Sequence, residues 1–385
     1  MTLPFDAVKL DRLLEEAGAD LLLAVTKHNI QYLLGGYRYF FFAHGDAIAT
    51  CRYLPIVGYF PGHPEQAFYV GAANEAWGLE VFPVWTPRTV TRSWTSVDAA
   101  LLAAGFIREA GLASGRIALE LSFFAADAMD TLRRELPDAR FVEAMMILEE
   151  LRAVKTEQEL KYLKAGAEAL VDSMLTTFLS AKPGVTEAQL VERLRLEQTK
   201  RGLDFDYALI TTGPTFGRAP SNRPWSPEEV LSLDTAGYSH GYLADMARMA
   251  VLGEPTPLMQ TLLSEVQHVQ AAARLPIAAG RLGGEIYEAG RAAIAECEHR
   301  DGLVFVAHGM GLIPHEAPHL TGSGEFPYPG THAERPLEAG MVLSIETGIK
   351  HPQAGFVKLE DTVVVTQTGW EAYADVGRHW NQVQP

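Results

Sequence analysis

The chain has 385 residues, of which 48% are hydrophobic, and its formal net charge is −16 at pH 7. This length suits two domains that each bury a core, and the negative charge without any Lys/Arg-rich run excludes nucleic acid as a partner. No secretory signal and no apolar run of about 18 residues is present, and Cys51 and Cys297 lie far apart in the sequence. We therefore expect a cytoplasmic protein with reduced thiols and no membrane partner.

The first 152 residues alternate between helical and strand patterns, which predicts a small α/β domain. The expected helices span 7–16, 97–109 and 124–135, and the expected strands span 20–25, 47–52, 66–70 and 116–120.

An aromatic segment, G-Y-R-Y-F-F-F, occupies residues 36–42. Because side chains of a strand alternate between its two faces, four consecutive aromatic residues cannot all enter one core. They either fill the core and a domain interface or form a patch that contacts a substrate or a second subunit.

A new helix is predicted to start at Thr156, because Thr156 and Glu159 have the spacing of a capping box. We place the domain boundary just before it, giving domains of residues 1–152 and 153–385. In the second domain we expect helices at 188–201, 256–273 and 284–298, a strand at 207–212 and a Gly/Pro-rich loop at 213–227.

Two apolar, β-prone runs around a turn-like segment at 238–241 predict a hairpin over residues 230–251. A turn centred between Ser239 and His240 would place Asp234 directly opposite Asp245, with Cβ atoms roughly 5 Å apart. Two carboxylates that close require a proton or a cation between them, and a divalent metal ion is the expected answer. A register slip of one residue would instead turn one aspartate toward solvent.

A second acidic pair is expected in the hairpin formed by residues 340–346 and 357–365. If its loop is centred on Gln353, Glu346 lies opposite Glu360. Upstream, His308 is followed by glycines at 309 and 311, which allow the backbone to approach a ligand closely. A histidine in such a place is either a metal ligand or an ordinary core or loop residue.

These segments together supply four carboxylates and one imidazole. Such an oxygen-rich set suits Mn²⁺, Co²⁺, Fe²⁺ or Mg²⁺ better than a structural zinc site. Two divalent ions roughly 3.5 to 4 Å apart would balance the four acids and hold a bridging hydroxide, which is hydrolytic machinery.

The chain resembles the pita-bread metallopeptidase family, which includes prolidase, Xaa-Pro aminopeptidase, methionine aminopeptidase and creatinase. The resemblance rests on D-x10-D at Asp234 and Asp245, H-G-x-G at His308, the strand glutamate Glu346, and E-D at Glu360. The N-terminal half adds H-N-I-Q-Y-L-L-G-G and L-R-A-V-K-T-E-Q-E-L. It implies an α+β fold, in which a creatinase-like α/β N-terminal domain (1–152) precedes a pita-bread catalytic domain (153–385).

The resemblance also implies roles for individual residues. Asp234 would bind one ion, Asp245 and Glu360 would bridge two, and His308 and Glu346 would complete the other site. The ions would be Mn²⁺ first, with Co²⁺, Zn²⁺ or Fe²⁺ as alternatives. Glu346 would also shuttle the proton, and His315 would steady the tetrahedral intermediate.

Family members of this branch are usually homodimers in which the N-terminal domain of one subunit closes the neighbour's site. The resemblance therefore implies a homodimer, with residues 37–44 reaching the partner's pocket. On this basis we predict that Tyr39 contacts the substrate.

Departures from the family pattern concern the substrate more than the metal. No histidine occurs between His63 and His240, although prolidase-like members carry a substrate-facing one there, and Arg218 lies in that loop instead. Lys358 replaces an arginine two residues before the last glutamate and so loses bidentate geometry. We predict that Arg218 and Lys358 contact the substrate.

The leading hypothesis is a dinuclear Xaa-Pro dipeptidase or aminopeptidase that cleaves the amide bond before proline through a metal-bridging hydroxide. An alternative keeps the metals and changes the substrate to a small non-peptide amide, cyclic amidine or zwitterion, attacked by hydrolysis or elimination. A third hypothesis, a non-catalytic binding module, has no need of five metal-site side chains.

Overall fold

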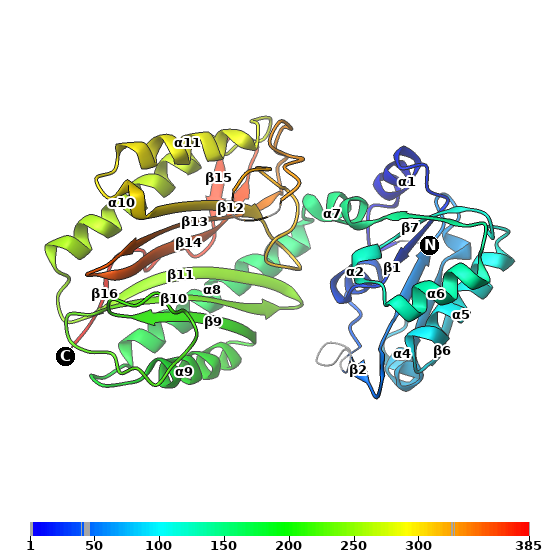
Figure 1. Ribbon diagram of the computed structural model, residues 1–385, viewed down its shortest axis with the longest axis horizontal. Helices are drawn as coiled ribbons and strands as arrows, with labels where there is room; N and C mark the ends of the chain where they lie inside the picture. Colours follow the sequence, from blue (N-terminus) through cyan, green and yellow to red (C-terminus); the bar gives the residue numbers. More distant parts are fainter. Residues whose placement is uncertain (1–2, 40, 42–46, 325, 327, 385) are drawn as a thin grey trace. The chain divides into compact units, whose positions relative to one another are not determined.

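The computed structural model describes residues 3–39, 41, 47–324, 326 and 328–384. Its contacts divide the chain into two compact units, Met1–Arg152 and Ala153–Pro385, which are both drawn in Figure 1. Within the described ranges, no helix has the length and apolar character needed to cross a membrane.

The N-terminal unit is built on a six-stranded sheet with the order β6-β5-β4-β1-β7-β8. Its strands are β1 (Leu21–Ala24), β4 (Ile56–Tyr59), β5 (Phe68–Ala72), β6 (Arg88–Ser93), β7 (Arg116–Leu119) and β8 (Arg140–Glu143), and its helices are α1 (Ala7–Glu16), α2 (Lys27–Leu33), α4 (Ala76–Val81), α5 (Ser96–Glu109), α6 (Ala126–Glu135) and α7 (Met145–Ala153). Both faces of the sheet are buried, because Leu21 and Leu23 of β1 enter one apolar cluster and Leu22 and Ala24 enter another. The expected α/β domain is confirmed.

One predicted strand of this unit is wrong. Residues 47–52 form two short paired strands, β2 (Ala47–Ile48) and β3 (Cys51–Arg52), instead of a single one. Ala49 adopts a left-handed backbone with φ 48°, and this turn folds the segment back on itself.

The aromatic segment contributes to the core of the N-terminal unit. Tyr37 and Tyr39 are buried there, and the Tyr37 hydroxyl donates to Glu75 Oε2 at 2.7 Å. The ring of Tyr39 contacts that of Tyr53, with centroids 6.4 Å apart. Phe40 and residues 42–46 lie outside the described residues, so the contact of this segment with a second subunit stays a prediction.

The C-terminal unit contains an eight-stranded sheet whose main path is β12-β13-β14-β11-β10-β9, with β15 beside β14 and β16 beside β11. Its strands are β9 (Asp204–Thr212), β10 (Val230–Ser239), β11 (Tyr242–Leu252), β12 (Leu303–Gly309), β13 (Val342–His351), β14 (Gly355–Val365), β15 (Trp370–Ala372) and β16 (Asn381–Val383), and its helices are α8 (Glu157–Leu179), α9 (Glu187–Lys200), α10 (Pro257–Arg274) and α11 (Gly284–Glu296). The predicted capping box at the start of α8 is confirmed, because Thr156 and Glu159 cap each other's backbone.

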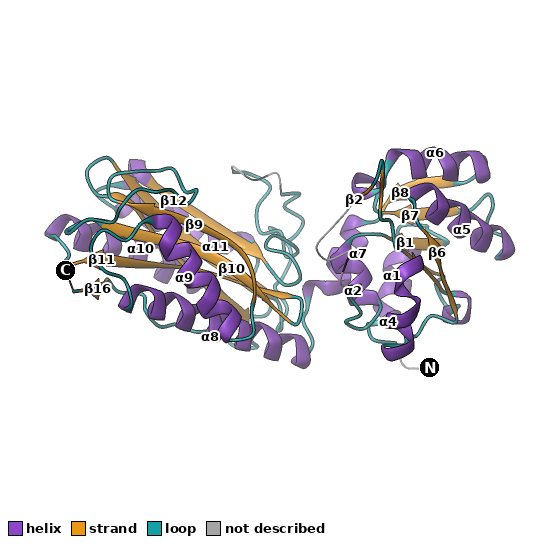
Figure 2. Ribbon diagram, turned by 90° about the horizontal axis from the view of Figure 1, so that it is seen from below, coloured by secondary structure: helices purple, strands orange, loops and turns teal. Residues whose placement is uncertain are grey.

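Helices α10 and α11 pack against the odd-numbered residues of β13 and β14. Leu343, Ile345 and Leu359 join the apolar cluster formed with α10 and α11, and these helices lie beside β12 to β14 in Figures 1 and 2. Gln270 of α10 donates to the carbonyl oxygens of Ile345 and Leu359 at 2.8 and 2.9 Å. Residues of the other parity on β13 and β14 therefore point to the opposite face of the sheet.

A buried ion cluster fixes β14 from the helix side. Asp361, fully buried, lies 2.9 Å from Arg248, 2.5 Å from Arg274 and 3.1 Å from Arg378. Burial alone would raise the pKa of Asp361, but the three guanidinium groups outweigh it and lower that pKa. The carboxylate is thus ionised and compensated inside the protein.

Candidate metal centre

The β10–β11 hairpin has a register different from the predicted one. Asp234 pairs with Ala247 and Asp245 with Ala236, so the two aspartates are diagonal neighbours and the predicted direct opposition is wrong. The turn is centred one residue later, at His240 and Gly241, which have φ of 53° and 82°. Two-residue hairpin turns of this kind require positive φ at both central positions. Because the shift preserves parity, both aspartates still share one face.

The β13–β14 hairpin has the predicted register. Glu346 pairs directly with Glu360, which confirms the centring of that loop on Gln353. Ala247, the partner of Asp234, also pairs with Glu360. One row across the sheet therefore reads Asp234, Ala247, Glu360 and Glu346, with small Ala247 leaving space between two acids.

The next row on the same face carries the remaining candidate ligands. His308 pairs with Ser344, two residues before Glu346, and Asp245 lies two residues before Ala247. Five strands, β10 to β14, therefore bring all five predicted ligands onto two adjacent rows of one face, and such rows are about 7 Å apart.

The five side chains form two groups that share one member. Ligand atoms of His308, Glu346 and Glu360 lie within 4.8 Å of one another, and so do those of Asp234, Asp245 and Glu360. The shared position of Glu360 suits a ligand between two ions. Asp245, which the resemblance assigns to both ions, lies in the second group.

The donor set fits divalent cations. Asp234, Asp245 and Glu360 are each at most 3% exposed, and one carboxylate oxygen of Asp234 and one of Asp245 find no hydrogen-bond partner among the described residues. Burial, Glu360 and Asp234 raise the pKa of Asp245, which is the expected response of acids crowded without enough positive charge. Buried carboxylate oxygens with one imidazole are ligands that divalent metals accept.

Lys358 lies inside this acidic cluster. Its Nζ is 2.5 Å from Asp234, 2.5 Å from Glu346 and 2.9 Å from Glu360. Burial alone would lower the pKa of Lys358, but the three carboxylates outweigh it and raise that pKa well above its usual value. Arg218 contacts Asp234 as well. Both cations predicted to contact the substrate are thus bonded to candidate metal ligands, and their substrate role stays a prediction.

Two hydroxyl groups that support the cluster were not predicted from the sequence. Tyr207 donates to Asp245 Oδ2 at 2.8 Å, and Ser344 donates to Glu360 Oε1 at 2.8 Å. Tyr207 reaches Asp245 across Ala236, which pairs with both residues and is too small to block the contact. The alternation of side chains along β9 would predict that Tyr207 faces Asp245, but only if the pairing of β9, β10 and β11 is already known.

His315 approaches the cluster from the loop after β12. Its ring stacks on that of His308, with centroids 3.9 Å apart, and its Nδ1 contacts the Tyr328 hydroxyl. Burial and nearby His308 lower the pKa of His315 to about 4, so its imidazole is neutral near pH 7. A buried ion pair between Lys155 and Glu316, 2.9 Å long, fixes the same loop.

A pocket of about 180 Å³ lies beside the acidic cluster, lined in part by Glu346 and Lys358. Arg218 also lines it. Tyr39 belongs to the other unit, where it is buried, and its predicted contact with a substrate stays untested.

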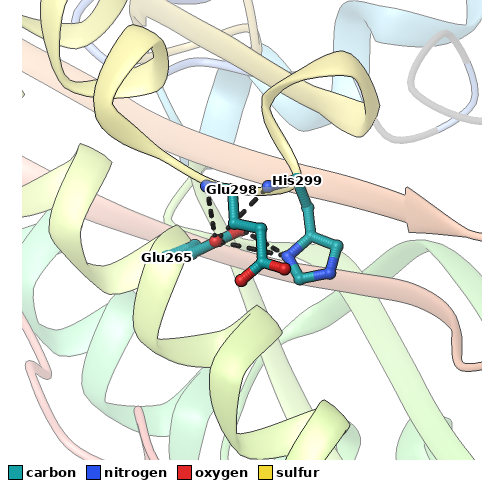
Figure 3. Close-up of side chains that lie close together, drawn as sticks. All are labelled: Glu265, Glu298 and His299. Atoms are coloured by element: carbon teal, nitrogen blue, oxygen red, sulfur yellow. Dashed lines mark hydrogen bonds and ion pairs between the residues drawn. The ribbon is translucent and has the colours of Figure 1, made fainter.

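A further group of possible ligands, Glu265, Glu298 and His299, is shown in Figure 3. Glu265 Oε1 accepts hydrogen bonds from the backbone N–H groups of Glu298 and His299 at 3.0 and 3.4 Å, and the His299 ring lies 3.2 Å away. The carboxylate thereby ties α10 to the segment after α11. This arrangement explains the group by hydrogen bonding without a metal.

Comparison with known proteins identifies the family of the chain. The model of metallopeptidase family M24 matches residues 162–367, and that of the creatinase/prolidase N-terminal domain matches residues 8–154. The uncharacterized peptidase YqhT of Bacillus subtilis is 27% identical over 61% of this chain, which spans 65% of that relative's length. The putative dipeptidase YkvY of the same organism is 22% identical to this chain, over 92% of this chain and 93% of the length of YkvY.

A solved structure of an Xaa-Pro dipeptidase from Bacillus anthracis has the same fold, with a TM-score of 0.80 at 22% identity over 99% of this chain and all of that one. The family resemblance and the two-part fold inferred from the motifs are therefore confirmed. The chain belongs to metallopeptidase family M24 and is, by its family, a metallopeptidase-like hydrolase with a creatinase/prolidase N-terminal domain.

Proposed function

We propose that this chain is a metal-dependent dipeptidase or aminopeptidase that cleaves the amide bond before proline. The observation that carries the proposal is the convergence of Asp234, Asp245, His308, Glu346 and Glu360 on one face of the sheet. Two similar proteins, the putative dipeptidase YkvY and the Xaa-Pro dipeptidase from Bacillus anthracis, support the substrate class.

Two groups of ligands are available for two ions, with Mn²⁺ as the first choice. His308, Glu346 and Glu360 would hold one, and Asp234, Asp245 and Glu360 the other. Bound there, divalent ions would activate water and polarise a substrate carbonyl group.

The protein's own residues supply proton transfer and orientation. Burial alone would raise the pKa of Glu346, but Lys358 and His308 lower it strongly, so its carboxylate is ionised at neutral pH. Because Glu346 also lines the pocket, it can accept a proton there and return it to the leaving amine. Neutral His315 adds a hydrogen-bonding group without adding charge.

The test is hydrolysis of Ala-Pro and Gly-Pro by metal-free protein supplied with Mn²⁺. Glu346→Gln should lower kcat by about 10² to 10⁴-fold, the usual contribution of a general base, whereas Glu334→Gln, at an exposed position of the same unit, should leave it unchanged. Metal content measured on the same samples shows whether lost activity reflects lost metal. A metal-loaded wild type that cleaves neither dipeptide contradicts the proposal.

That last outcome would favour a second candidate, hydrolysis or elimination on a small non-peptide amide, cyclic amidine or zwitterion. The observation behind it is the pocket wall, where Phe216 and Arg218 occupy the loop that carries a histidine in prolidase-like proteins. A screen of such compounds on the Mn²⁺-loaded protein decides between the two.

The proposal also includes a homodimer in the cytoplasm. Sedimentation velocity on the purified chain tests the assembly, and fractionation of the native cells tests the location.

A further inference from the structure

The pocket beside the acidic cluster combines aromatic walls with positive charge. Phe216, Phe326 and Phe356 line it together with Val304 and Val306. The charged side chains that line the pocket are those of three cations, Arg218, Lys350 and Lys358, and of Glu346.

Two of the three cations are already engaged. Lys358 is bonded to three carboxylates, and Arg218 contacts Asp234 while its guanidinium carbon lies 5.3 Å from the centre of the Phe356 ring. Lys350 is exposed and forms no ion pair with any residue in the described ranges. It is the cation at this pocket whose charge is available to a ligand.

The strand register gives the spacing between Lys350 and the acidic cluster. Glu346 pairs with Glu360, Gly348 with Lys358 and Lys350 with Phe356, so the three rows follow one another on the same face. With rows about 7 Å apart, the Lys350 backbone is about 14 Å from that of Glu346, and the four-carbon stem of the lysine spans part of this gap. The distance that remains between the Lys350 ammonium group and the acidic cluster corresponds to the length of one or two substrate residues.

Gly348 keeps the space between these rows open. A Cβ atom at this position would come 2.9 Å from the Phe356 ring, so any larger residue would force the ring to move. The glycine therefore leaves the Phe356 ring in its position on the pocket wall, where it offers an apolar surface to a bound group.

We infer that this pocket selects substrates whose leaving part carries an apolar ring or side chain and ends in a free carboxylate, and that Lys350 is the residue that recognises the carboxylate. The inference rests on the proposed function and narrows it, because dipeptides and other short peptides with a free C-terminus fit, whereas long or amidated peptides lose the contact. A charge-assisted hydrogen bond from the ammonium supplies the selectivity.

The kinetic test compares Ala-Pro and Ala-Phe with their C-terminal amides. Lys350→Gln should raise KM for the free acids about tenfold, the low end for a hydrogen bond to a charged group, without changing kcat, and should leave KM for the amides unchanged. The control Lys161→Gln removes an exposed lysine of α8 that pairs with Glu157 and should alter neither. Equal effects of Lys350→Gln on acids and amides, or no effect on either, would overturn the inference.

A binding test separates this inference from the proposed function. Calorimetric titration of the Mn²⁺-loaded protein with 3-phenylpropionate and with 3-phenylpropionamide should show at least fivefold tighter binding of the acid, and Lys350→Gln should abolish the difference. If the difference depends on Lys350 but no peptide is hydrolysed, the proposed function fails and the carboxylate pocket stands. If the acid preference is missing, or survives in Lys350→Gln, the pocket inference fails whatever the enzyme hydrolyses.

Discussion

Replacing Lys358 with methionine should destabilise the metal-free protein strongly. The ammonium group lies between Asp234, Glu346 and Glu360, and the lysine side chain is only 7% exposed. Methionine keeps the length of the apolar stem and removes the charge. The carboxylates would then repel one another in a buried site without this compensating cation.

The size of the effect follows from the burial of the contacts. Removing one partner of a buried ion pair costs about 3 to 5 kcal/mol. For a domain of about 150 to 250 residues, each kcal/mol shifts Tm by about 2 to 4 °C, so the transition of the unit Ala153–Pro385 should fall by about 6 to 20 °C. Saturating Mn²⁺ should shrink this difference, because bound cations take over the neutralisation of the acids.

The assay is thermal unfolding with a chelator and with Mn²⁺, followed by calorimetry. Lys350→Met is the matched control, since it removes an exposed lysine from β13, the strand paired with that of Lys358, and should change stability by no more than about 0.5 kcal/mol. The reasoning is refuted if chelated Lys358→Met unfolds at the wild-type temperature, or if Mn²⁺ leaves its destabilisation undiminished.

Three further outcomes are expected. Asp361→Asn leaves the buried Arg248 and Arg274 without their shared carboxylate and should cost about 3 to 5 kcal/mol in urea unfolding; a loss below 1 kcal/mol would contradict the cluster's role. Burial raises the pKa of Glu75 above 4.5 despite opposing hydrogen bonds, so the folded state binds more protons at this residue than the unfolded state does. Wild type should therefore lose stability relative to Glu75→Gln as pH rises from about 4.5. Denaturation curves between pH 5 and 8 that show the opposite slope would disprove this. Gly309→Ala places a Cβ against neighbouring backbone and should destabilise by about 1 to 3 kcal/mol or more, detectable as a lower Tm, whereas an unchanged Tm would show that the loop can move aside.

The sequence was most informative where a local pattern has a single structural solution. The capping box at Thr156 determined where α8 begins, and parity alone placed Asp234 and Asp245 on one face. Parity also aligned Glu346 with Glu360, because the loop between their strands is short and symmetric.

Features that depend on turn geometry were harder to predict. The alignment of Asp234 with Ala247 follows from the left-handed backbone of His240, a conformation that a histidine adopts only occasionally. Tyr207 was missed for a related reason, since its contact with Asp245 crosses an intervening strand whose register no local pattern specifies. The position of Lys358 among the acids required knowledge of three strands at once.

Two consecutive acids on β14 have a consequence for how the strand can be aligned. Glu360 faces the ligand cluster, and Asp361 faces the arginines on the helix side. A slip by one position would turn Glu360 toward the helix side and Asp361 toward the ligand cluster. It would also send Lys358 into the apolar layer, away from its three carboxylates, and turn apolar Leu359 toward the acidic cluster. The alternation of side chains along β14 therefore favours a single register between its neighbouring strands and disfavours the shifted ones.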